Sequence, residues 1–139
     1  MVEVNTAALK TAASDFSNTL LPLVESVKTL VDQNTELPAM SWGVIGAMTV
    51  SGNYHPARDY QLRQLKDAVK CLHGVNAGLY SVALHYDEKE LENARAAYQA
   101  ANGVTDQSKA AAKVHELEQR VSKDTEEFNT AKKSDDSYH

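Results

Sequence analysis

The stretch Leu62–Glu90, LRQLKDAVKCLHGVNAGLYSVALHYDEKE, decides the fold, because one set of positions recurs through it at helical spacing. Successive members are separated alternately by three and four residues: Leu62, Leu65, Val69, Leu72, Asn76, Leu79, Ala83, Tyr86 and Glu90. This spacing places them all on one stripe of an α-helix. Pro56 is tolerated in a first helical turn and Asn102–Gly103 is a stop signal, so the pattern predicts a helix over Pro56–Ala101.

An earlier run has the same alternation and predicts a first long helix over Thr6–Asp32, ended by the turn residues before Pro38. Pro22 lies inside it and lacks an amide donor, so we expect a kink there. The two helices should bury their stripes against each other as an antiparallel hairpin. The predicted helix interface comprises Leu9, Phe16, Leu20, Leu23, Val27, Leu62, Leu65, Val69, Leu72 and Leu79.

A third, weaker run predicts a helix over Gln107–Lys132; its positions are Ala110, Val114, Leu117, Val121, Asp124 and Phe128. Because few of these are large and apolar, this helix should be the least firmly held. The expected fold is all-α: a helical hairpin over residues 1–103, a C-terminal helix over 104–132 and a disordered tail over 133–139. A hairpin leaves half of each stripe uncovered, so either the third helix folds back or a second protein completes a bundle.

Composition excludes several classes of function. The chain has 139 residues and a net charge of -5 with acids and bases interleaved, so it lacks the basic stripe that nucleic-acid binding needs. No apolar run reaches the roughly 18 residues of a membrane span, and the N-terminus lacks the layout of a cleaved signal peptide. The histidines and the lone cysteine lack the spacing of a metal site or a catalytic pair. We therefore expect no enzyme activity and no cofactor.

The segment between the first two helices, SWGVIGAMTVSGNYH from Ser41 to His55, is apolar but irregular and rich in glycine. Loops usually run over the surface, so an apolar one needs cover. The glycines allow positive φ angles and close approach. We expect Trp42 to close the open end of the hairpin, with this elbow acting as a lid.

The order of these features resembles the WXG-type helical hairpins exported by type VII (ESX) secretion systems of actinobacteria and firmicutes. It is most similar to the EspC-like actinobacterial secretion targets, whose elbow carries an aromatic residue, two glycines and a downstream tyrosine. The matching positions are Trp42, Gly43, Gly46 and Tyr54. The tyrosine and acidic residue of the export motif fall on Tyr86 and Glu90. Glycine follows the tryptophan directly here, with valine at position 44, which favours the EspC-like variant over the Trp-x-Gly turn.

The resemblance covers about residues 9–98 and implies a type VII substrate. Such a protein is made in the cytoplasm without a cleaved signal peptide and is secreted or displayed at the cell surface. Its implied partners are a small helical protein or a second copy of itself, and the secretion ATPase. Tyr86 and Glu90 would be the secretion signal. The alternative is a cytosolic coiled-coil adaptor or secretion chaperone in which Tyr86 is only structural. An effector acting on a host or a rival bacterium, that is, a role in virulence, is a third reading.

Overall fold

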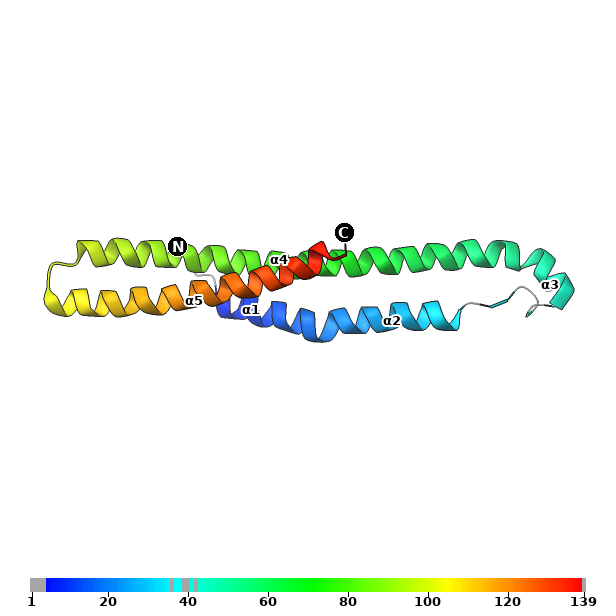
Figure 1. Ribbon diagram of the computed structural model, residues 1–139, viewed down its shortest axis with the longest axis horizontal. Helices are drawn as coiled ribbons and strands as arrows, with labels where there is room; N and C mark the ends of the chain where they lie inside the picture. Colours follow the sequence, from blue (N-terminus) through cyan, green and yellow to red (C-terminus); the bar gives the residue numbers. More distant parts are fainter. Residues whose placement is uncertain (1–4, 36, 39–40, 42, 139) are drawn as a thin grey trace.

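The computed structural model describes residues 5–35, 37–38, 41 and 43–138, without the side chains of residues 47, 48 and 51. The molecule is an elongated rod built along one helix, α4 (Ser51–Ala100), which at 1.5 Å per residue is about 75 Å long (Figure 1). All regular elements of the described residues are helical, so the predicted all-α class is confirmed. This helix is longer than predicted at its N-terminal end. It begins at Ser51, so Pro56 lies inside it and not at its start.

The N-terminal arm consists of α1 (Thr6–Asp15), a π-helical turn η1 (Phe16–Leu20) and α2 (Leu21–Asn34). The Asn5 side chain accepts a hydrogen bond from the amide of Ala8 and caps α1. In the π turn, the amide of Leu21 donates to the carbonyl of Phe16, five residues earlier. Pro22 follows directly, and an α-helical ladder would have lost its donor there. The arm bends at this turn (Figure 1).

The extra residue in the π turn moves the buried stripe of α2 one position along the chain. Leu21 is buried and Val24 and Val31 are half-buried, whereas the predicted positions face solvent. The predicted interface is corrected here: Leu20, Leu23 and Val27 are 37%, 58% and 42% exposed, and Leu30 is 59% exposed. These four side chains, Leu20 at the end of η1 and the other three on α2, form an exposed row, here named the exposed apolar row on α2. On α4, by comparison, Val69 is buried, and Leu62, Leu65, Leu72 and Leu79 are half-buried, as are Leu9 and Phe16 in the arm.

The predicted irregular elbow is largely helical. A short helix, α3 (Gly43–Thr49), is followed by a turn at Val50 and then by the start of α4. Nothing between Gly43 and His55 breaks a helix as strongly as proline does, since glycine costs only about 1 kcal/mol. The expectation that the apolar residues of this segment are covered as a lid is wrong for Val44 and Ile45, which are 68% and 80% exposed.

The last helix, α5 (Val104–Asp136), folds back antiparallel along α4 (Figure 1). Its packing on α4 is the most extensive between any two elements, so the expectation that it would be weakly held is wrong. The helix is longer than predicted, and the predicted disordered tail at 133–139 is helical as far as Asp136. Tyr138 then stacks on His73 of α4 with ring centroids 4.1 Å apart and donates a hydrogen bond to Glu25.

The N-terminal arm and α5 overlap only along the middle of α4. The arm runs antiparallel to α4 from Thr35, near Tyr54, to Lys10, near Asp87, while α5 contacts α4 from Arg95 down to His73. Three helical segments therefore meet at residues 73–87 of α4, where the start of α2 is still close to the C-terminal segment, as the hydrogen bond from Tyr138 to Glu25 shows. None of the described helices is long and apolar enough to cross a bilayer.

Candidate functional site

The predicted secretion-signal pair lies on α4, ten residues or more before its end, beside α5. The Tyr86 side chain is 42% exposed. The Glu90 carboxylate is 46% exposed and faces two cations of α5, with Lys113 at 3.4 Å and Arg120 at 3.7 Å. The pair is thus accessible, but it does not lie at a free helix end, because α5 runs alongside it.

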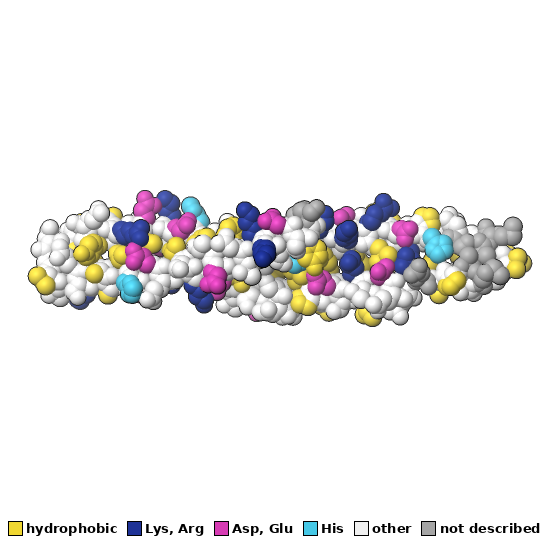
Figure 2. All heavy atoms as spheres, viewed as in Figure 1, with side chains coloured by type: hydrophobic (Ala, Val, Ile, Leu, Met, Phe, Trp, Pro, Cys, Tyr) yellow, Lys and Arg dark blue, Asp and Glu magenta, His cyan; other side chains and the backbone are white. Residues whose placement is uncertain are grey.

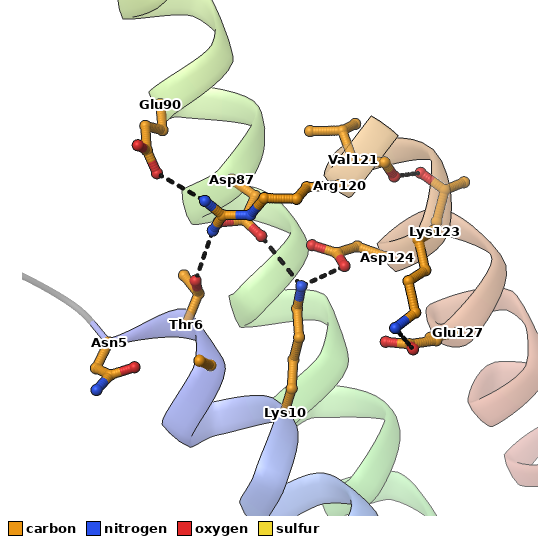
Figure 3. Close-up of polar contacts among 12 residues, drawn as sticks. Asn5, Thr6, Lys10, Asp87, Glu90, Arg120, Val121, Lys123, Asp124 and Glu127 are labelled. Carbon is orange, nitrogen blue, oxygen red and sulfur yellow. Dashed lines mark hydrogen bonds and ion pairs between the residues drawn. The ribbon is translucent and has the colours of Figure 1, made fainter. Parts of the chain in front are cut away.

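Glu90 also belongs to a polar junction that joins three helices (Figure 3). The junction is formed by Thr6, Lys10, Asp87, Glu90, Arg120 and Asp124. The Lys10 ammonium from α1 lies 3.2 Å from Asp87 Oδ2 and also contacts Asp124 of α5. The Arg120 guanidinium donates to Asp87 Oδ1 at 2.6 Å and to Thr6 Oγ1 at 3.1 Å. Each helix therefore contributes a charge that another helix neutralises.

The two carboxylates of the junction are almost fully buried, at 0% exposure for Asp87 and 2% for Asp124. Burial alone would raise the pKa of Asp87. The hydrogen bonds from Asp124, Lys10 and Thr6 and the charge of Arg120 outweigh it, so the pKa lies below its ordinary value of 3.8. Burial and the hydrogen bond with Asp87 raise the pKa of Asp124 above 3.8, although Lys10 opposes this. Asp87 is thus the preferred carrier of the negative charge.

The elbow residues are placed separately from the junction, at the far end of the rod. Trp42 lies outside the described residues. Gly43 begins α3 with φ of 69°, in the left-handed region, as expected of an elbow glycine. Gly46 lies inside α3, where its backbone is helical. Tyr54 lies in the first turns of α4, and its hydroxyl donates to the carbonyl of Thr35 at 2.7 Å.

Arg58 closes the turn between α2 and α4, a role that the sequence pattern did not reveal. Its guanidinium donates to Thr35 Oγ1 at 3.1 Å, to the carbonyl of Asp32 at 3.0 Å and to the Asp32 carboxylate at 3.3 Å. One of the last carbonyls of α2, that of Asp32, is thereby satisfied by a cation, whose charge is also favourable at the negative end of the helix dipole. Tyr54 and Arg58 together attach the C-terminal end of α2 to α4.

The junction holds three helices together through ion pairs and hydrogen bonds. Its carboxylates are already paired with cations, and among the described residues no group of three histidine, cysteine or acidic side chains could hold a metal ion. The sequence analysis found Glu90 but not Lys10, Asp87 or Arg120. One signal was present: Asp124 occupies an apolar position of the third helical run, and an acid there calls for a buried cation.

Comparisons with protein-family models, with curated proteins and with solved structures found no match to this chain.

Proposed function

We propose that this protein is a helical interaction protein exported by a type VII secretion system, and that it pairs with another small helical protein. The exposed apolar row on α2 carries the interaction part of the proposal. Leu20, Leu23, Val27 and Leu30 recur at helical spacing over about ten residues and are 37% to 59% exposed. A row of this kind is the surface that an amphipathic partner helix covers.

The surface of the rod favours a protein partner over nucleic acid. Acidic and basic side chains are mixed along the face seen in Figure 2, and the net charge of the chain is -5. A phosphate backbone needs a continuous basic surface. A partner helix needs apolar anchors with a mixed polar rim, and α2 offers such anchors.

The export part of the proposal depends on Tyr86 and Glu90. Recognition by an export machine needs side chains that are accessible in the folded protein, and both are more than two-fifths exposed. Tyr86 is not a core residue, so its ring is available for contact with a receptor. The neighbouring Asp87 anchors this turn of α4 to α1 and α5 and holds the pair on a rigid support.

One observation favours the alternative, a cytosolic coiled-coil adaptor or secretion chaperone. Glu90 faces Lys113 and Arg120 within the chain, so its carboxylate already has a structural role in attaching α5. In that reading Tyr86 and Glu90 need no receptor. The exposed apolar row on α2 fits both functions, and only export separates them.

The decisive experiment measures the protein in the culture filtrate and in cells that carry a type VII system. Tyr86→Ala should abolish export while the intracellular protein stays folded, because truncating a half-exposed ring removes little buried area. Tyr60→Ala is the matched control, since Tyr60 lies on the same helix and is 57% exposed. Equal export of both variants would refute the signal role and favour the adaptor.

A further inference from the structure

A cavity lies at the overlap of the three helical segments, next to the polar junction. Its volume is about 530 Å³, and its lining comes from the N-terminal arm, α4 and α5. Sites for small molecules usually measure about 300–1,000 Å³ and occur between the helices of bundles. The cavity is therefore large enough for a compact organic molecule.

Asn76 provides an unpartnered hydrogen-bond acceptor in this lining. The residue is 6% exposed, and its buried Oδ1 atom has no hydrogen-bond partner among the described residues. A buried amide oxygen that accepts no hydrogen bond is unfavourable, so a bound group that donates one to it would be stabilised. Asn76 also occupies an apolar position of the helical run on α4, where a leucine would have packed. An occupant with an N–H or O–H group would satisfy it.

The charged residues around the cavity favour a cation. Glu126 and Glu127 line it together with Lys123, whose ammonium lies 3.5 Å from Glu127. Burial and the negative charge of Glu127 raise the pKa of the Tyr80 phenol, which also lines the cavity. The acceptor of Asn76 and the excess of carboxylate charge thus both favour the same group, a protonated amine.

Part of the lining is suited to an apolar body, while Ser17, His73, Thr130 and Ser134 make the rest polar. Leu21 of α2 and Ala131 of α5 are buried and line the cavity, and Tyr80 of α4 lines it as well. We infer that the cavity binds a small amphipathic amine, whose ammonium donates to Asn76 Oδ1 and faces Glu127 while its apolar part packs on Leu21, Ala131 and Tyr80. An aromatic ring beside an ammonium adds a favourable cation–π contact.

The test is isothermal titration calorimetry on the full chain with three probes of matched size: tryptamine, tryptophol and indole-3-acetate. These carry an ammonium, a hydroxyl and a carboxylate on the same ring system. Tryptamine should bind at least about tenfold more tightly than tryptophol, and indole-3-acetate should bind weakest, because a charge-assisted hydrogen bond is stronger than a neutral one. No binding of tryptamine, or equal binding of the three probes, would overturn the inference.

Three variants locate the binding. Asn76→Leu removes the acceptor and should weaken tryptamine binding by about tenfold, the usual effect of losing a hydrogen bond to a charged group. Asn76→Asp keeps the shape and the acceptor and should preserve or strengthen it, so the role of the position can be read even if the leucine variant unfolds. Glu127→Gln should weaken tryptamine but not tryptophol, while the exposed Glu88→Gln should change neither. Unchanged tryptamine affinity in both Asn76→Leu and Glu127→Gln would place the amine elsewhere and refute the site.

Discussion

The carboxylates of Asp87 on α4 and Asp124 on α5 converge on one ammonium group, that of Lys10 on α1 (Figure 3). A single side chain thereby connects three helices whose residues are up to 114 positions apart in sequence. Because Arg120 adds a second cation to Asp87 only, the two acids differ in their dependence on charge. Two nearly isosteric substitutions should therefore cost unequal amounts of stability.

Asp87→Asn should destabilise the protein by about 3 kcal/mol at neutral pH, the lower end for a broken buried ion pair, because Lys10 and Arg120 retain partial solvent access. Asp124→Asn should cost much less. The amide resembles the protonated acid, which the folded state favours, and it can still donate to Asp87 and accept from Lys10. Urea unfolding of both variants measures the difference. Equal losses would show that the charge is shared evenly between the two carboxylates.

The same asymmetry predicts how stability depends on pH. Asp87 has a lowered pKa in the folded protein, so its contribution is present above 3.8, its ordinary value, and is lost as the pH falls through the folded value. Asp124 has a raised pKa, so its contribution is present below 3.8 and is lost as the pH rises through the folded value. The pair therefore stabilises the fold most between the two folded values, with Asp87 ionised and Asp124 protonated.

Urea unfolding of the wild type and of Asp124→Asn, measured from acidic to neutral pH, isolates this contribution. The free energy of unfolding of the wild type should fall relative to the variant as the pH rises above 3.8. Above this pH the unfolded wild type ionises Asp124 more readily than the folded protein does, whereas the variant has no carboxyl group at this position. A difference between the two proteins that stays constant over this range would contradict the raised pKa of Asp124.

Leu117 is the fully buried leucine of α5 and tests whether this helix is part of the core. Leu117→Ala should lower the free energy of unfolding by roughly 2 to 5 kcal/mol, through lost burial and the cavity left behind. Val104→Ala is the control, since Val104 is on the same helix and 87% exposed, and its truncation should change stability by less than about 0.5 kcal/mol. Similar losses in thermal unfolding would mean that α5 does not dock on α4.

Helical periodicity alone predicted the all-α class and the existence of each long helix, because these depend on local spacing. It could not predict which face of α2 is turned toward α4. Uninterrupted α-helical spacing places Leu20, Leu23 and Val27 in line with Phe16, but the π turn before Pro22 inserts one residue and turns this set outward. Such a turn depends on how the arm packs as well as on the proline, so composition and spacing did not reveal it.

The candidate site was only partly predictable, for a similar reason. Tyr86 and Glu90 were found through a motif, but the buried positions at this level of α4 are Ala83, Asp87 and Leu91. The arm ends at this level, where Lys10 and Thr6 lie near Asp87, and α5 is the partner of α4 beyond it. The partners of Asp87 come from α1 and α5, and contacts at such separations leave no periodic signal in the sequence.

The exposed apolar row on α2 should mediate pairing. Replacing Leu23 and Val27 together by serine should shift the protein, or its complex with a helical partner, toward the monomer in light scattering, because both anchors lose their apolar contact. The fold should survive, since these side chains are 58% and 42% exposed. Val75→Ser with Val82→Ser on α4 is the matched control, as both are 45% exposed. A wild-type protein that stays monomeric alone and with every small helical candidate would remove this role from the row.

The phase of α2 should depend on Pro22. In Pro22→Ala, residue 22 regains an amide donor and loses the ring that opposes an α-helical turn, so the arm can continue as an uninterrupted α-helix. The row at Leu20, Leu23 and Val27 would then turn toward α4, and Leu21 and Val24 would turn outward.

Thiol alkylation reports this rotation in a Cys71→Ser background, which removes the exposed native cysteine. With Pro22 present, Leu23→Cys should react several-fold faster than Val24→Cys, because Leu23 is exposed and Val24 is half-buried. With Pro22→Ala the order should reverse. If Leu23→Cys stays the faster site in both backgrounds, the π turn is held by the packing of Leu21 against α4 and not by the proline. The outward position of the α2 row would then be a property of the tertiary fold, which no substitution at position 22 could change.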